Sequence, residues 1–122
     1  MKLHEAKTAG SKLFTAYGAG YVEINGERFN GSLIVTASSV QPWAPTSFEA
    51  LAEEHFAALL ALQPEVVIFG SGQRLRFPHP RLTAALSNAG IGVEVMDSNA
   101  ACRTYNILLA EDRQVIAVLL GE

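Results

Sequence analysis

The sequence predicts an α/β domain in three layers, in which an N-terminal antiparallel meander is followed by strand, helix, strand, helix and strand around a mixed central sheet. Two patterns predict this fold. Short strands broken by glycine turns fill the first third, and β-branched runs then alternate with apolar residues at helical spacing. A length of 122 residues, with 49% hydrophobic and 17% charged residues, suits a single globular domain over residues 1–122.

The first third is expected to contain strands at residues 12–17, 21–24, 27–29 and 32–36. The dipeptides Asn25-Gly26 and Asn30-Gly31 predict hairpin turns between them, because asparagine and glycine both tolerate positive φ angles. A further extended piece at residues 39–43 ends at Pro42 and Pro45, which lack the amide hydrogen that a central strand needs. The meander is therefore expected to end near these prolines.

The next segment is predicted to form one helix that covers the sheet. Thr46 and Glu49 have the spacing of a capping box, in which a hydroxyl and a carboxylate each accept from an exposed backbone N–H. Apolar side chains then recur at helical spacing until Pro64 stops the run.

The second half of the chain alternates strands and helices. Its first strand is a continuous β-branched and aromatic run closed by Gly70, which is typical of a strand covered on both faces. A helix is expected between Pro80 and Gly90, which suit its first turn and its end. The remaining elements are expected as strands at 92–96 and 114–120, with a third helix from residue 97 to about residue 110.

Charge and cysteine content exclude several classes of function. A net charge of −3 offers no general attraction to nucleic acid or to anionic lipid. Residues 1–13 carry charges through every apolar stretch, so neither a secretory segment nor stable membrane insertion is expected, and the cytoplasm is the predicted location. Cys102 is the single cysteine, so no internal disulfide can form.

The glycine turn Gly70-Ser71-Gly72 is the strongest candidate for a ligand pocket. It follows a buried strand, where open α/β sheets bind ligands and where bare backbone N–H groups can approach an anion. The alternative is a structural turn, because no third glycine and no Gly-Lys-Ser/Thr follow. Asp97 and Ser98 are expected at the same edge of the sheet, as pocket residues or as caps of the third helix.

Several single residues are weaker candidates. Asn106, within the third helix, could contact a ligand or bind a neighbouring backbone. Positive charge in the loop after Gly72 could attract an anion or an acidic partner, or be ordinary solvated loop charge; it comes from Arg74, Arg76, His79 and Arg81. His79 has the pKa range of a general base but no spaced nucleophile. Cys102 is either a small core residue or a reactive thiol whose pKa is lowered by the positive charge of Arg103.

One aromatic residue is a candidate for a protein-partner surface. Trp43 lies in an apparent edge segment, and aromatic anchors carry much interface energy, although it could equally close the local core. No metal is expected, because His4, His55 and His79 show no paired ligand spacing, and no cofactor is expected.

The chain also resembles a known family. The resemblance is carried by residues 66–72 (VVIFGSG), 90–98 (GIGVEVMDS), Ala101, 104–106 (TYN), the Asn30-Gly31-Ser32 turn, the Trp43 segment and residues 115–120. These are similar to the domain-of-unknown-function family with an Mth-like fold that includes mitochondrial NADH dehydrogenase (complex I) assembly factor three and the adipogenesis-associated Mth domain-containing proteins.

The resemblance implies a three-layer α/β fold with a mixed sheet, and it attaches no firm activity to bacterial members. Two positions depart from the family pattern. Ser98 stands where the family usually has threonine, which keeps a capping hydroxyl. Asp112 stands where the family usually has glycine, at an expected left-handed helix end that aspartate accepts less readily.

Function is expected to follow one of three hypotheses. The first is a non-enzymatic binding module, an assembly factor by family resemblance, with an unknown protein partner and a monomeric or small homo-oligomeric state. The alternative is a small-molecule-binding protein or enzyme that uses the pocket at the Gly70-Ser71-Gly72 turn. A third is a structural subunit that only dimerises.

Overall fold

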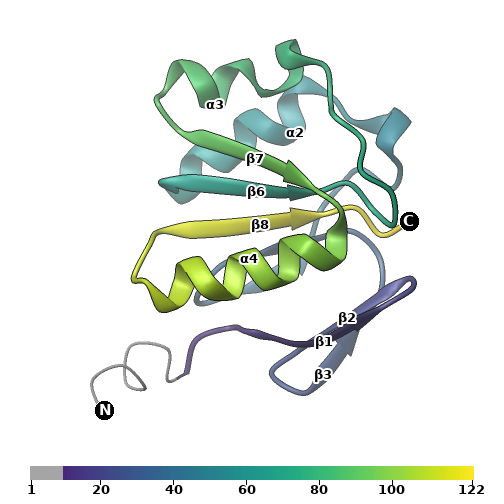
Figure 1. Cartoon of the computed structure of the whole chain (residues 1–122). Helices are drawn as coiled ribbons and strands as arrows, with labels where there is room; N and C mark the ends of the chain where they lie inside the picture. The colour runs from purple at the N-terminus through teal and green to yellow at the C-terminus, as the bar shows by residue number, and fades with distance from the viewer. Residues whose placement is uncertain (1–9) are drawn as a thin grey trace.

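The computed structural model describes residues 10–122 and contains two sheets (Figure 1). A small antiparallel sheet has the order β1-β2-β3, and a five-stranded mixed sheet has the order β5-β4-β8-β6-β7. The strands are β1 (Phe14–Gly18), β2 (Tyr21–Ile24), β3 (Glu27–Phe29), β4 (Leu33–Val35), β5 (Val40–Pro42), β6 (Val66–Gly70), β7 (Gly92–Met96) and β8 (Val115–Leu119). The predicted strand positions are confirmed to within two residues.

The five-stranded sheet is covered on both faces, so the predicted three-layer α/β fold is confirmed. Helix α4 (Ser98–Ala110) and the small sheet cover one face, and α2 (Glu53–Ala57) and α3 (Ala84–Asn88) cover the other (Figure 1). Each face of the sheet has its own hydrophobic core. Along β6, Val66 and Ile68 belong to the core beneath α4, whereas Val67 and Phe69 belong to the core beneath α2 and α3. This alternation is why the strand is a continuous apolar run.

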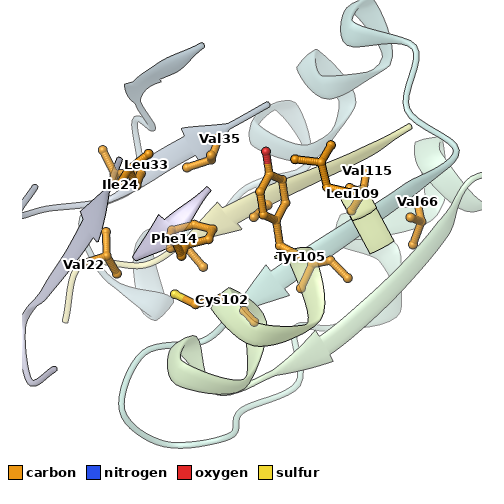
Figure 2. Close-up of a cluster of buried hydrophobic side chains, with 14 residues drawn as sticks. Phe14, Val22, Ile24, Leu33, Val35, Val66, Cys102, Tyr105, Leu109 and Val115 are labelled. Carbon is orange, nitrogen blue, oxygen red and sulfur yellow. The ribbon is translucent and has the colours of Figure 1, made fainter. Parts of the chain in front are cut away.

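The core beneath α4 is organised around an aromatic pair. The rings of Phe14 and Tyr105 meet edge to face, with centroids 5.3 Å apart. Figure 2 shows both rings between the small sheet and α4, with Cys102 on the same helix. Burial raises the pKa of the Tyr105 phenol, whose hydroxyl donates to the carbonyl of Lys12 at 3.0 Å.

One of the two predicted hairpin turns is wrong. Asn25-Gly26 does form a tight reversal between β2 and β3, with φ angles of 51° and 86°. After Asn30-Gly31, however, the chain leaves the small sheet, and β4 pairs with β5 and β8. Leu33 and Val35 are buried beside β8, so burial of β4 decides its partner and the turn residues alone do not.

The predicted continuous helix that begins at Thr46 is also wrong. The structure has three short pieces: η1 (Phe48–Ala50), α2 and η2 (Ala58–Leu62). Ser47, rather than Thr46, caps the first piece, because its hydroxyl accepts from the N–H of Ala50 at 3.2 Å. Leu51 and Ala52 are then extended, and α2 restarts where the ring of His55 accepts from the N–H of Ala52 at 2.9 Å.

The other helices follow the sequence more closely. η3 (Pro80–Thr83) begins with the predicted proline and leads into α3, and Gly90 follows with a φ of 79°. Asp97 caps α4 as one of its predicted roles, through a 2.9 Å bond from the N–H of Ala100. Asp112 adopts the left-handed conformation expected where the family has glycine, with a φ of 65°.

Parallel pairing brings three loops to one edge of the sheet. β6 is parallel to both of its neighbours, and Gly70 is in register with Met96 of β7 and with Leu119 of β8. The segments that follow these three residues therefore leave the sheet side by side, as open α/β sheets require for a ligand crevice.

Candidate functional site

A cavity of about 190 Å³ lies where the small sheet meets the carboxyl ends of the parallel strands. Its wall is made by residues 18–21 at the junction of β1 and β2, by Gly72 after β6, by residues 97–99 at the start of α4, and by residues 119–122 at and beyond the end of β8. Of the six predicted pocket residues, three line this cavity: Gly72, Asp97 and Ser98. The other three do not: Gly70, Ser71 and Asn106.

Gly72 and Ser98 hold the two loops of the cavity together. The N–H of Gly72 donates to the hydroxyl of Ser98 at 3.0 Å, and the N–H of Ser98 donates to the carbonyl of Gly72 at 2.8 Å. Gly72 has a φ of 100°, and an added Cβ would lie 2.9 Å from the backbone oxygen of Glu122. A side chain at position 72 is therefore excluded by both conformation and space.

The first two residues of the glycine turn face the core rather than the cavity. Ser71 is fully buried, and its hydroxyl donates to the carbonyl of Arg74 at 2.6 Å and accepts from the N–H of Arg76 at 3.0 Å. A Cβ on Gly70 would lie 2.6 Å from Leu119 and 3.0 Å from the Ser98 hydroxyl. Ser71 thus shapes the loop, and Gly70 allows close packing.

The N-terminus of α4 reaches the cavity with several of its donors already engaged. The N–H of Ala100 donates to the side-chain carboxylate of Asp97, and the N–H of Ala101 donates to the backbone carbonyl of Asp97 at 2.9 Å. The N–H of Ser98 donates to the backbone carbonyl of Gly72. An anion binds a helix N-terminus through free N–H groups, so this terminus is poorly suited to phosphate. The Asp97 carboxylate adds a repulsive negative charge.

A second carboxylate, that of Glu122, lines the same cavity but is already paired. Its Oε2 lies 3.1 Å from Nη2 of Arg76 and accepts from the N–H of Phe48. The Arg76 guanidinium also donates to the carbonyl of Ser71 at 2.9 Å and lies 4.7 Å from the centre of the Phe48 ring. Arg76, one of the arginines predicted to attract an anion, therefore fastens the loop instead.

Asn106 lies behind the cavity and cross-links two elements. Its side-chain oxygen accepts from the N–H of Phe14 at 3.0 Å, and its side-chain nitrogen donates to the carbonyl of the same residue at 2.8 Å. The amide is therefore occupied by the backbone of β1, in line with the structural alternative for this residue.

Of the two roles left open for Trp43, the structure supports the core position and not the partner surface. Its side chain is 5% exposed and belongs to the core beneath α2 and α3. The ring meets Phe56 and Phe69 edge to face at 5.5 and 6.1 Å. The aromatic neighbours that bury it lie far along the chain, and the local prolines gave no sign of them.

Cys102 and His79, the two weak candidates for chemical reactivity, both have structural roles. Cys102 is fully buried, and desolvation raises the pKa of its thiol to about 12, despite the lowering effect of Arg103. The His79 ring caps η3, where Nδ1 accepts from the N–H of Arg81 at 3.1 Å. Within residues 10–122 no cluster of three His, Cys, Asp or Glu side chains could hold a metal ion. His4 lies outside the described residues.

Sequence reasoning missed the most exposed large apolar residue of the described chain. Phe77 is 69% exposed, and Leu75 in the same loop is 53% exposed. A usable signal was present, because both residues stand in a stretch that matches neither a strand nor a helix pattern. An apolar residue outside such a pattern has no core position assigned to it and marks a candidate surface.

A family model described as "Protein of unknown function (DUF498/DUF598)" matches residues 14–120. The chain belongs to this family. Among its relatives is the Bos taurus NADH dehydrogenase [ubiquinone] 1 alpha subcomplex assembly factor 3, which is 36% identical over 83% of this chain. This chain spans 55% of the length of that relative. The resemblance to the family of complex I assembly factor three is thus confirmed.

Two further comparisons cover almost the whole chain. A protein of Francisella tularensis named "13 kDa major membrane protein" is 29% identical, with 98% of this chain and 99% of the relative aligned. The crystal structure of a protein from Bordetella parapertussis has a TM-score of 0.87 and 36% identity, and the match covers 93% of this chain and 98% of that one. In residues 10–122 no helix is long and apolar enough to span a bilayer.

Proposed function

We propose that this chain is a non-enzymatic protein-binding module that assists the assembly of a multi-subunit complex, with a respiratory NADH dehydrogenase as the first candidate. The similarity to the bovine assembly factor supports this proposal, because it extends over 83% of the chain at 36% identity and so covers most of the fold. The proposal treats the chain as one domain that acts in the cytoplasm, alone or as a small homo-oligomer.

Deletion of the gene in its own cell tests the proposal. Native gel electrophoresis with an NADH-oxidation stain should show less of the complete dehydrogenase and an accumulated subcomplex. Expression of the unchanged chain should restore the complete enzyme. An unaltered pattern of complexes in the deletion strain would contradict the assembly role.

The cavity supports a second candidate, a small-molecule-binding protein or enzyme. Its lining contains the carboxylates of Asp97 and Glu122 but none of the Lys, Arg or His residues of the described chain. Electrostatics and the occupied donors of α4 therefore favour a neutral polar or cationic ligand over a phosphate. Of the residues predicted for this pocket, Gly72, Asp97 and Ser98 remain candidates for ligand contact.

A further inference from the structure

Strand β7 forms an open edge of the five-stranded sheet. It pairs with β6 and has no neighbour on its other side among the described residues. Its end residues bond to the β6 side: the N–H of Gly92 donates to Glu65, and the carbonyl of Met96 accepts from Ser71. Because bonding alternates along a parallel strand, Val93 and Val95 direct their N–H and C=O groups to the open edge.

A groove with a volume of about 420 Å³ runs along this edge. Its apolar wall is made by Val93 and Val95 of β7, by Ile91, and by Phe77, Pro78 and Pro80 before and at the start of η3, while Thr83 and Ser87 add polar side chains. Phe77 is the exposed aromatic residue that no core position explains. The free backbone groups and the apolar wall therefore occur together, which is the arrangement that domains binding an added strand use.

We propose that β7 binds an extended segment of a partner protein as an added antiparallel strand. The segment has apolar side chains that enter the groove on either side of a basic residue, which faces Glu94. The inference rests on the proposed function in one respect, since it specifies the chemistry of the assembly partner. Antiparallel addition is chosen because it is the more stable pairing per residue.

Glu94 decides between a foreign segment and a second copy of this chain. It is exposed at the middle of β7, between the two residues that bond outward. The antiparallel pairing of two copies that uses Val93 and Val95 in each places Glu94 opposite Glu94 of the second copy. Like charges directly opposite one another destabilise a strand pair, whereas a lysine or arginine there stabilises it.

The other edge of the sheet is unsuited to strand addition. β5 has three residues and ends in Pro42, which has no N–H to donate. Short strands, prolines and charged side chains all protect sheet edges. β7 has neither of the first two, and its exposed charge, Glu94, opposes pairing only with a strand that places a like charge opposite it. The choice of β7 therefore follows from the contrast between the two edges.

The test uses synthetic seven-residue peptides with a central lysine or glutamate flanked by valines, titrated into the 15N-labelled full chain. The lysine peptide should shift the amide signals of Val93 and Val95 and slow their hydrogen exchange. It should bind about fivefold more tightly than the glutamate peptide, and Glu94→Lys should reverse that preference. Phe77→Ala should weaken both peptides, whereas Ile107→Ala, at an exposed apolar position on α4, should not.

Several results would overturn the inference. The first is that neither peptide moves the Val93 and Val95 signals at millimolar concentration, and the second is that Glu94→Lys leaves the preference unchanged. If sedimentation shows that the wild-type chain is a dimer and hydrogen exchange shows the amides of Val93 and Val95 protected in it, the strand bound at β7 is a second copy and not a partner segment.

Assembly in the cell separates this inference from the proposed function. Assembly restored fully by a chain carrying both Glu94→Lys and Phe77→Ala would leave the proposed function standing and place the partner's binding site elsewhere. Peptide binding without an assembly defect would leave the strand site and remove the proposed function.

Discussion

The side-chain amide of Asn106 binds both backbone groups of Phe14, and it thereby joins α4 to the first strand of the small sheet. Each bond replaces a pairing that an edge of the small sheet would otherwise make with water or with another strand. Since the same sheet forms one wall of the cavity, this pair of residues fixes the position of the candidate site.

Asn106→Ala should therefore lower the free energy of unfolding by about 2 kcal/mol, because two partly buried backbone groups lose their partner. Asn99→Ala is the matched control, since Asn99 is an exposed asparagine of the same helix, and it should change stability by less than about 0.5 kcal/mol. Urea unfolding followed by circular dichroism measures both. Equal midpoints would show that the link to Phe14 adds nothing.

Gly70→Val should destabilise the chain more than Ser71→Ala. The added side chain meets the buried Leu119 at a distance that packing does not allow, and overpacking of this kind costs about 3 kcal/mol. Ser71→Ala removes a hydroxyl that serves the loop backbone and should cost about 1–2 kcal/mol. Gly92→Ala is the control, because the nearest atom to its Cβ lies 3.9 Å away. Thermal melts that rank the three variants differently would contradict this account of the turn.

Much of the fold was predictable because the strands and α4 have strong local patterns. The β6 run, the Asp97 cap and the left-handed Asp112 are each determined by a few neighbouring residues. The partner of β4 was not predictable in this way, since the turn at Asn30-Gly31 has the residues of a hairpin. Its pairing depends on burial beside β8, which lies far along the chain.

The candidate site was predicted in part for a similar reason. The topology of parallel strands brings Gly72, Asp97 and Ser98 together, and sequence reasoning used that topology. It could not assign the wall contributed by the β1–β2 turn, because nothing local indicates where the small sheet packs. It also could not tell that Arg76 is engaged by Glu122.

Alkaline pH should destabilise the chain in a way that Cys102 reports. Burial raises the folded-state pKa of this thiol from 9.0 to about 12, so the unfolded chain releases the proton first. The contribution of the protonated Cys102 thiol to the free energy of unfolding is complete below pH 9 and is lost as the pH rises towards 12. Cys102→Ala should flatten the decline of stability that begins near pH 9, and the later decline from Tyr105, whose pKa burial also raises, should persist. Identical pH profiles for the two chains would contradict this assignment.

Ligand binding in the cavity should favour cations and neutral polar compounds. A fluorescence-melt screen at low salt should show stabilisation by one such class and none by nucleotides or sugar phosphates. Ala19→Phe, at an exposed position of the lining, should abolish the shift, whereas Ala37→Phe, an exposed alanine outside the cavity, should keep it. Stabilisation by phosphate compounds that survives Ala19→Phe would place binding elsewhere.

Replacing Trp43 should harm folding, whereas replacing Phe77 should harm partner binding. Trp43→Ala removes a 5% exposed ring from contact with Phe56 and Phe69, and such truncations cost about 3–5 kcal/mol. Phe77→Ala removes a ring that is 69% exposed and should change the free energy of unfolding by less than about 0.5 kcal/mol. Chemical denaturation measures the free energy of unfolding of both variants. Partner binding, measured at equal concentrations of folded chain, should be weakened more by Phe77→Ala than by Trp43→Ala. If Phe77→Ala proved as destabilising as Trp43→Ala, the groove beside β7 would be part of the core, and the exposed aromatic residue would no longer mark a binding surface.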